Sequence, residues 1–410
     1  MLPSFCFRCA GEEIYYYLEL TRQKYEPYGS AFAGTGLRGG DHGRNCTAIP
    51  VMRRNEVGST RPKTGPVCVV EYTALEHNSI HLQASLLNSV LAGSLGLDVK
   101  SLYTCNFRQF IAILAISRSQ LPVIYHYGSF DLFAFLFMFR KRTTFVYHNY
   151  TPARFFWRWE PLVAIRSLFT RMQLLLMPRR TAWIAVSPWN AQCLKELDFS
   201  DVRECPCIVR GSEAGEQGAE PALLFVGRIS PNKNCLELVG QVRKAAHLLQ
   251  TKITLSIVGD VKPGCPYGKR FTSYISEISS VDPLRIRWYR GRVSQCELDE
   301  LYWRSWLYVS MSLHEGFGLP VCEAIAHGVP AVYLECGGTE SVLSGLGMVP
   351  LQERERFWSF LVNFIESKQA REELLGRQKQ VVNSCMLPKV EETIRSVYGS
   401  FYLLASGTLA

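Results

Sequence analysis

Residues 307–334, LYVSMSLHEGFGLPVCEAIAHGVPAVYL, contain the signals of a strand, a glycine-containing loop, a helix and a second strand in direct succession. LYVSMS is a short apolar run, and Gly316 and Gly318 stand in the loop that follows it. Gly328 ends the helical stretch as its C-cap, and PAVYL resumes the strand pattern. Strand, helix and strand in this order are the unit of a parallel sheet whose faces are covered by helices, so the stretch predicts an α/β domain.

The same alternation extends on both sides of this stretch. Towards the C-terminus come further helical segments, and upstream lie the strand-like runs LLFVG, ITLSIVG and RIRWY. The polar, Gly-rich residues 210–221, RGSEAGEQGAEP, are typical of an exposed linker between domains. Before them, VCVVEY, DVKSLYT, PVIYH, TTFVYH and TAWIAVS alternate with helical stretches near residues 79–95, 107–117, 132–140 and within 160–177. A chain of 410 residues is also too long for one ordinary core, so two α/β domains are predicted.

The net charge of +9 comes mostly from one region. Residues 140–180 contain nine Lys or Arg residues and one acid, Glu160, and such a local positive field attracts phosphates, nucleic acid or an anionic membrane. Residues 154–159, RFFWRW, interleave aromatic and basic side chains ahead of an apolar helix with further arginines. This segment either lies in a membrane interface or forms a core helix with solvated arginines. No nucleic-acid-binding motif accompanies the charge, so nucleic acid is not an expected partner.

No signal peptide or membrane-spanning segment is predicted, because the first residues lack a basic and apolar leader and the longest apolar runs fall short of the ~20 residues that span a bilayer. Several cysteines sit inside apolar runs, where they act as small buried hydrophobes. A reduced, cytoplasmic protein is expected, at most peripheral at the inner face of the membrane. Residues 1–66 have no predicted role, and the GxGxxG match at residues 34–39 lacks a flanking strand and helix.

Three clusters of polar residues follow predicted strands, where ligands of open α/β sheets bind. In the first, Gly227, Arg228 and Lys233 follow LLFV, and two fixed cations at that edge can neutralise a diphosphate. Solvated loop charges would give the same pattern.

The second cluster lies in the opening stretch itself. Glu315 precedes the loop residues Gly316, Phe317, Gly318 and Leu319, whose amides lead into a helix that carries Glu323. Glycines allow close backbone approach, and a helix start favours phosphate or sugar oxygens. Eight positions of helical rise would separate the glutamates by ~12 Å, more than the ~5–10 Å of a glycosidase pair, so two separate hydroxyl-binding roles fit better.

The third cluster lies in the N-terminal half. His148 and Asn149 end the strand TTFVYH and would face the same cleft, although a histidine after a strand is as often structural. His77 and Asn78 follow the first strand, and together with Asn149 they are candidates for the acceptor side.

The ordered set VGRISPNK, EGFGLPVCEAIAHGVPAV and GGTESV resembles glycosyltransferase family 4, whose members have the GT-B fold of two Rossmann-like domains with parallel sheets facing a central cleft. The resemblance implies an N-terminal acceptor domain (67–212), a C-terminal nucleotide-sugar donor domain (221–385) and a C-terminal helix (386–410) that packs back towards the N-domain. It implies a retaining transfer from a nucleotide-diphosphate sugar to a glycan or lipid-linked acceptor, in polysaccharide or glycoconjugate synthesis, without metal or cofactor.

The family pattern also implies a role for each matching residue. Arg228 and Lys233 would bind the donor diphosphate, and Glu323 the ribose hydroxyls. Glu315 and the amides of residues 317–319 would contact the sugar and phosphate, and His148 would approach the sugar from the N-domain.

The sequence departs from the family pattern at two places. Asn234 stands where members often have Gly, and TALEHNS replaces the usual Gly-rich first loop. The altered first loop leaves a non-catalytic nucleotide-sugar-binding subunit as one alternative. A sugar-nucleotide epimerase of the same fold is the other, although Glu315 and Glu323 in their GFGLP context argue against it.

Overall fold

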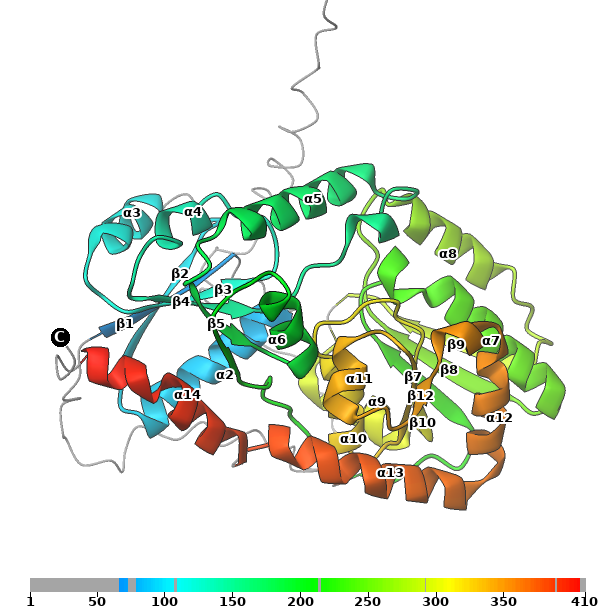
Figure 1. Cartoon of the computed structure of the whole chain (residues 1–410). Coiled ribbons are helices and arrows are strands. Elements are labelled where there is room, and N and C mark those ends of the chain that lie inside the picture. Colours follow the sequence, from blue (N-terminus) through cyan, green and yellow to red (C-terminus); the bar gives the residue numbers. More distant parts are fainter. Residues whose placement is uncertain are drawn as a thin grey trace, which may run out of the picture. The chain divides into compact units, whose positions relative to one another are not determined.

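The computed structural model describes residues 66–72, 79–106, 109–212, 215–291, 293–387 and 389–405, and all the statements below concern these residues. They form two six-stranded sheets in which all strand pairs are parallel (Figure 1). The prediction of two parallel α/β domains is confirmed.

The N-domain sheet has the order β2-β1-β3-β4-β5-β6. Its strands are β1 (Pro66–Glu71), β2 (Asp98–Tyr103), β3 (Val123–Tyr127), β4 (Thr143–Tyr147), β5 (Ala182–Ala185) and β6 (Asp201–Glu204). The helices between them are α2 (Ser79–Ser94), α3 (Phe110–Arg118), α4 (Ala134–Phe137), the 3-10 turn η2 (Ala153–Phe155), α5 (Pro161–Leu176) and α6 (Pro188–Lys195). The sequence did not predict β6, because its residues DVRE form no apolar run.

The C-domain sheet has the order β12-β11-β10-β7-β8-β9. Its strands are β7 (Ala222–Val226), β8 (Ile253–Val258), β9 (Leu284–Tyr289), β10 (Leu307–Ser310), β11 (Ala331–Leu334) and β12 (Met348–Val349). Its helical segments are η3 (Pro231–Lys233), α7 (Cys235–Leu249), α8 (Pro266–Ser276), α9 (Gln295–Arg304), α10 (Leu319–Ala326), α11 (Gly338–Leu343), η4 (Leu351–Arg356), α12 (Phe357–Glu366), α13 (Lys368–Val382) and η5 (Asn383–Cys385).

Alternate residues of the N-domain strands enter two different cores, as expected of a sheet covered on both faces. Cys68, Val70 and Tyr125 pack towards α3–α6, whereas Val69 and Ile124 pack towards α2. The second of these cores continues through the C-domain helices α10 and α13. One apolar cluster therefore belongs to both domains.

The chain crosses between the domains twice, at places that lie side by side. After β6 it enters the C-domain through residues 205–221, and after η5 it returns as α14 (Lys389–Ala405), which contacts α2 and β1 (Figure 1). The amide of Val209 donates to the Cys385 carbonyl at 3.0 Å, and Val209 forms a parallel bridge with Met386. The start of the predicted linker is packed closely, since a Cβ on Gly211 would lie 2.3 Å from that of Ala326.

Candidate active site

The carboxyl ends of β7 and β8 bring glycine backbone together at the edge of the C-domain sheet. A Cβ on Gly259 would lie only 2.0 Å from the Gly227 carbonyl oxygen, and Gly259 has φ +150°. Beyond this contact the chain turns through η3, which carries Lys233, and Arg228 lies exposed at the same edge. Arg228 makes no ion pair with any of the described residues.

Lys233 and Glu315 form an ion pair across this edge. Their Nζ and Oε1 atoms are 2.5 Å apart, and each side chain is only 15% exposed. Little solvent therefore screens the pair, and the carboxylate fixes the position of the ammonium group. A ligand diphosphate could approach an ammonium already held in place.

The loop that contains Glu315 packs against the loop of GGTESV. The amide of Glu315 donates to the Cys336 carbonyl, and the amide of Gly338 donates back to the Glu315 carbonyl at 3.1 Å. Gly318 has φ +85°, and a Cβ there would lie 2.1 Å from the Thr339 hydroxyl. Both conditions require glycine. Within the described residues, the amides of Gly316, Phe317 and Gly318 donate no hydrogen bond, so they are available to an oxygen-rich ligand.

Glu323 is on α10 and is 8% exposed. Burial raises the pKa of its carboxyl group to about 7, and the charges of Arg210 and His327 and a hydrogen bond from the Tyr302 hydroxyl act in the opposite direction. A carboxyl group in this state could accept hydroxyl hydrogen bonds once ionised. The separation of Glu315, at the sheet edge, from Glu323, on the buried helix, is consistent with two distinct roles.

The N-domain meets this loop directly. A Cβ on Gly316 would lie 2.4 Å from the His148 carbonyl oxygen, and the Ser187 hydroxyl donates to the Gly316 carbonyl at 2.7 Å. The Trp189 ring packs against Gly337 and lies 5.3 Å from the His314 ring. The structure thus places His148 beside the predicted donor loop.

Sequence reasoning did not identify Ser187, Trp189 or His314. Ser187 followed by Pro188 is a helix-start signature, and the Ser187 hydroxyl does accept the Asn190 amide at 3.2 Å. Its contact with the other domain has no local signal in the sequence.

The other predicted N-domain residues have different surroundings. Asn149 is buried, and both ends of its amide are used within the N-domain, by Asn190 at 2.7 Å and by the Tyr150 amide at 2.7 Å. Its side chain is therefore occupied in holding the turn after β4. His77 and Asn78 lie outside the described residues.

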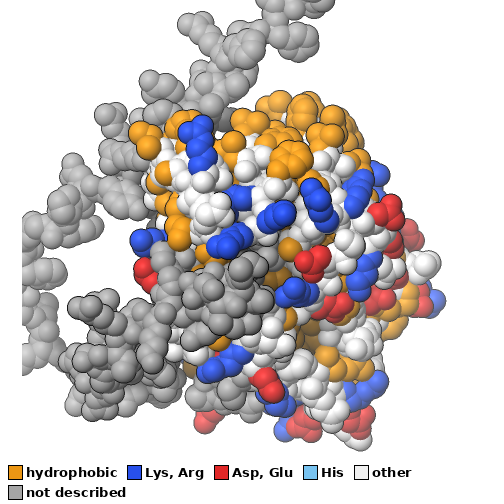
Figure 2. Space-filling model, turned by 60° about the vertical axis from the view of Figure 1, so that its left-hand side comes forward, with side chains coloured by type: hydrophobic (Ala, Val, Ile, Leu, Met, Phe, Trp, Pro, Cys, Tyr) orange, Lys and Arg blue, Asp and Glu red, His pale blue; other side chains and the backbone are white. Residues whose placement is uncertain are grey.

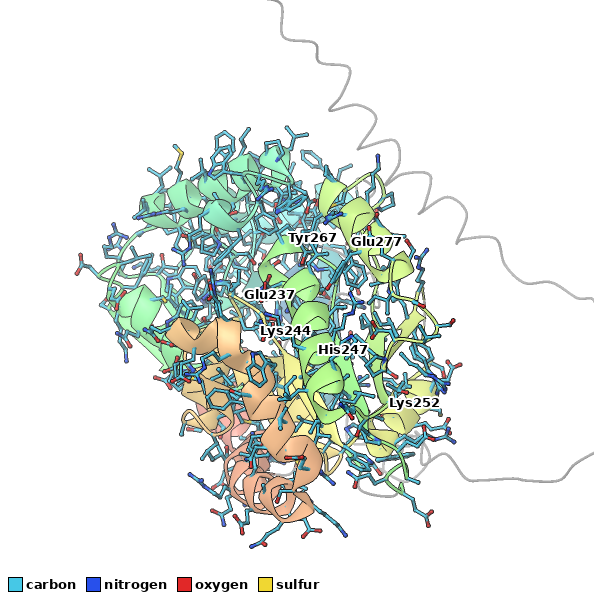
Figure 3. All side chains as sticks on the ribbon, turned by 90° about the vertical axis from the view of Figure 1, so that its right-hand side faces the viewer. Glu237, Lys244, His247, Lys252, Tyr267 and Glu277 are labelled. Atoms are coloured by element: carbon cyan, nitrogen blue, oxygen red, sulfur yellow. The ribbon has the colours of Figure 1, made fainter. Side chains whose placement is uncertain are left out.

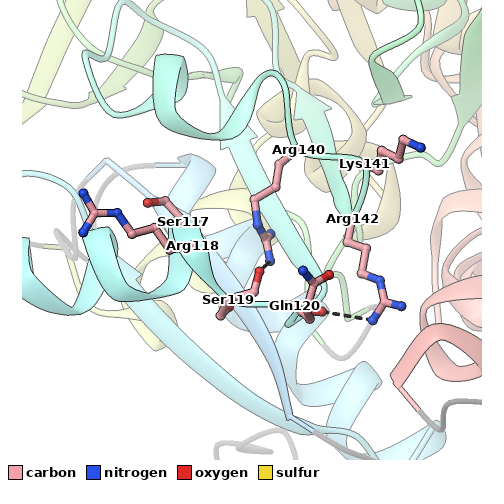
Figure 4. Close-up of a pocket in the computed structure, with 7 residues that line it drawn as sticks. All are labelled: Ser117, Arg118, Ser119, Gln120, Arg140, Lys141 and Arg142. Atoms are coloured by element: carbon pink, nitrogen blue, oxygen red, sulfur yellow. Dashed lines mark hydrogen bonds between the residues drawn. The ribbon is translucent and has the colours of Figure 1, made fainter.

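A basic pocket of about 330 Å³ lies elsewhere, at the amino ends of β3 and β4 (Figure 4). Two of its four cations are used internally: Arg140 Nη2 donates to the Ser119 carbonyl at 2.7 Å, and Arg142 Nη1 donates to the Gln120 carbonyl at 3.1 Å. These bonds tie the loop before β3 to the loop before β4. Ligands of parallel sheets bind at the opposite, carboxyl ends, so this pocket is separate from the candidate site.

The described residues contain no group of three or more His, Cys, Asp or Glu side chains placed to hold a metal ion. Nor does any helix in the described ranges have the length and apolar character needed to cross a bilayer.

Part of the chain matches a known protein family. Residues 212–345 match the family described as glycosyl transferases group 1. The chain has the GT-B fold. It is similar to a sucrose-phosphate synthase from Thermosynechococcus elongatus (14% identity, TM-score 0.66, covering 82% of this chain and 99% of that one). It is also similar to the pneumococcal O-GlcNAc transferase GtfA, solved with UDP and GlcNAc (12% identity, TM-score 0.55, covering 72% and 60%).

A short sequence match points to the same family. A protein named glycosyltransferase 41, from the Sulfolobus islandicus filamentous virus (isolate Iceland/Hveragerdi), is 39% identical over 62 residues. The match spans 15% of this chain and 19% of the viral protein's length. The matched residues 212–345 of this GT-B protein include Arg228, Lys233, Glu315 and Glu323.

Proposed function

We propose that this GT-B protein is a retaining glycosyltransferase that moves a sugar from a nucleotide-diphosphate sugar to a hydroxyl group of a glycan or lipid-linked acceptor. The proposal rests on the groups that meet at one edge of the C-domain sheet. These are the Lys233–Glu315 pair, the exposed Arg228 and the unused amides of residues 316–318. His148 of the other domain lies beside them. The group 1 family match covers the whole donor half of this edge.

The chemistry of the step is electrostatic. The acceptor oxygen bonds to the anomeric carbon while the bond from that carbon to the diphosphate oxygen breaks. The diphosphate leaves with the electron pair and takes the acceptor proton. Lys233 and Arg228 stabilise the charge that develops on the diphosphate, and the loop amides do the same. Glu323 holds the ribose hydroxyls.

The experiment first measures which of UDP, GDP and ADP raises the melting temperature, since a ligand of the native state stabilises it. Nucleotide release from the corresponding nucleotide sugars is then followed, with product analysis. We expect Lys233→Ala and Arg228→Ala each to slow release by about 10²-fold. Lys244→Ala is the matched control, because Lys244 is exposed on α7, away from this edge (Figure 3).

The same experiment distinguishes the two alternative functions, because each predicts a different result. Stabilisation by a nucleotide without release of product would indicate a non-catalytic subunit, and an epimerised sugar would indicate an epimerase. Release at the wild-type rate by folded Lys233→Ala and Arg228→Ala variants would refute the proposal.

We further propose that the acceptor is reached at an anionic membrane surface, through helix α5. This helix buries Ser167, Thr170 and Gln173, and it exposes apolar residues. The buried side chains are bonded within the N-domain: the Ser167 hydroxyl donates to the Thr151 carbonyl, and Gln173 Nε2 donates to the Asp131 carbonyl at 2.7 Å. Since these bonds fix the polar side inwards, the apolar side is fixed outwards.

The exposed apolar side is large and continues onto the neighbouring segment. Figure 2 shows hydrophobic side chains gathered along the top of the view, where α4 and α5 lie in Figure 1, with Lys and Arg side chains beside them. Its residues, called the apolar face below, are 40–72% exposed and comprise Leu132, Leu136, Phe139, Leu162, Ile165, Leu168, Phe169, Met172, Leu175 and Leu176.

The basic residues around the apolar face favour an anionic membrane as its partner. Arg166 and Arg171 are exposed on α5 itself, and Arg154, Arg158, Arg179 and Arg180 are exposed at its two ends. Apolar side chains bordered by cations suit a bilayer surface with anionic head groups. The aromatic segment that suggested this from sequence is only partly exposed: Phe156 is buried and the Trp159 ring lies 5.3 Å from that of Tyr267 on α8, whereas Trp157 is 49% exposed. The apolar face replaces it as the contact surface.

A further inference from the structure

Four ionisable side chains gather at the carboxyl edge of the N-domain sheet, on the face that α2 covers. Glu71 ends β1, His126 lies in β3, His148 follows β4, and His81 is in the first turn of α2. In the β1–β3 register Val70 pairs with Tyr125, so the next step sets Glu71 beside His126. These four residues are called the N-domain cluster below.

The cluster consists of two hydrogen-bonded pairs. Glu71 Oε2 is 2.9 Å from His81 Nδ1, and His126 Nδ1 is 2.8 Å from His148 Nε2, with the two latter rings stacked at 5.1 Å. The His148 carbonyl in turn abuts Gly316 of the donor loop. The N-domain cluster therefore stands next to the place where the donor sugar would lie.

One atom of each pair has no partner. Glu71 Oε1 and His126 Nε2 are buried without any hydrogen bond, in side chains that are 1% and 5% exposed. Leaving a polar atom buried and unpaired costs about 1–3 kcal/mol, so such atoms mark a site that a ligand completes. Both atoms belong to neighbouring strands at the ligand-binding edge of the sheet.

The two unpaired atoms offer no fixed positive charge to an anionic ligand. Burial lowers the pKa of His148 to about 4 and holds the pKa of His126 well below its usual range, so neither ring is charged at neutral pH. Burial raises the pKa of Glu71 to about 7, and the ionised carboxylate accepts hydrogen bonds and repels a phosphate. A hydroxyl group can donate to Glu71 Oε1, and a second one can pair with His126 Nε2.

We propose that Glu71 and His126 bind neighbouring hydroxyl groups of an uncharged sugar or polyol, which is the accepting part of the acceptor. The inference rests on the proposed function and narrows it: the group that receives the sugar is not a phosphate. The two ligand sites then have different charge, with cations of the C-domain facing the diphosphate, and the Glu71 carboxylate and the uncharged His126 ring facing the hydroxyls.

The test compares transfer to water with transfer to added probes, in the full-length protein. The neutral probes are methyl glucoside, methyl mannoside, methyl N-acetylglucosaminide and glycerol, and the anionic probes are glucose 1-phosphate and glycerol 3-phosphate. We expect a neutral probe to accelerate nucleotide release more than any anionic probe at equal concentration. Glu71→Gln should reduce this acceleration about 10-fold or more, because a site built to bind hydroxyls discriminates strongly.

Two features of the experiment distinguish a failure of this inference from a failure of the proposed function and from misfolding of the variant. The shift in melting temperature with nucleotide should be the same in Glu71→Gln as in the wild type, since nucleotide binding uses the donor site only. His126→Gln should act in the same direction if Glu71→Gln fails to fold. Asp282→Asn is the matched control: it removes another buried carboxylate paired with a histidine, His247 on α7, at 3.3 Å (Figure 3). Unchanged acceleration in the folded variants, or acceleration of the wild type by anionic probes only or by none, would overturn the inference.

Discussion

The His148 carbonyl oxygen occupies the space that a side chain on Gly316 would need, because a Cβ there would lie 2.4 Å away. The two residues belong to different domains, so the absence of a side chain at one position sets how closely the domains approach. This contact joins the turn after β4 to the donor loop.

Gly316→Ala should therefore move the turn that contains His148 away from the loop that contains Gly316. Backbone cannot yield as a flexible side chain can, so the His148 turn would have to move by several tenths of an ångström. We expect turnover to fall about 10-fold or more, because small misplacement of reacting groups is costly. Nucleotide binding, measured by calorimetry, should change little. Gly376→Ala is the control, since Gly376 on α13 has open space around it. Equal turnover in the two variants would argue against a role for this contact.

Asn234 adopts the left-handed conformation, with φ 53° and ψ 37°, between η3 and α7. The family often has Gly here, and the structure gives the reason, since both residues tolerate this conformation better than others do. Asn234→Ala should lower the free energy of unfolding by about 1 kcal/mol, and Asn234→Gly should be nearly neutral. Urea unfolding measures both. A neutral Asn234→Ala would show that the backbone relaxes at this position.

The buried carboxyl of Glu323 should make stability depend on pH. The group ionises near 4.5 in the unfolded chain, and burial raises its pKa to about 7 in the folded protein. Between these values the folded state holds a proton that the unfolded state has released, so the contribution is complete below pH 4.5 and is lost as pH rises to 7. The groups around it are Arg210, His327, Tyr302 and Asp299.

Glu323→Gln should remove this contribution. Between pH 5 and 8 the wild type should lose on the order of 2 kcal/mol relative to the variant. Urea midpoints of both proteins at each pH give the difference. The comparison is needed because Glu71 changes stability in the same direction, and the buried His126 and His148 change it in the opposite one. Parallel pH profiles would mean that Glu323 is ionised throughout.

The apolar face should contribute little to folding, and it should be required for binding to membranes. Phe169, Met172 and Leu176 are 49–62% exposed, so changing all three to Gln should cost less than about 0.5 kcal/mol per site. The variant should no longer sediment with vesicles that contain phosphatidylglycerol, whereas Leu248→Gln, at an exposed position of α7, should bind like the wild type.

Binding to vesicles should also depend on the basic residues near α5. Wild-type binding should weaken with salt and when Arg154, Arg158 and Arg166 become Glu. Equal recovery of the wild type with anionic and neutral vesicles, or with neither, would favour a soluble acceptor.

Local sequence predicted the donor half of the site because its parts are contiguous. Residues 314–323 contain loop, helix start and both glutamates, and Lys233 follows the neighbouring strand at the same edge. Glu71, His126 and Ser187 were not identified, because their contacts come from strand pairing and domain packing rather than from any motif. The orientation of α5 could not be predicted either: periodicity distinguishes two sides of a helix, but the partners of Gln173 decide which one is buried.

The paired crossings at Val209 and Met386 limit how the two halves of this protein can move. Two covalent links that run side by side and share a hydrogen bond behave as a single pivot, whereas links far apart would resist any rotation. Rotation about an axis through this pivot would open the His148–Gly316 contact, and sliding of one half past the other would strain both links at once. Substrate entry is therefore expected to follow a swinging motion, with each catalytic cycle returning the same few backbone atoms to contact.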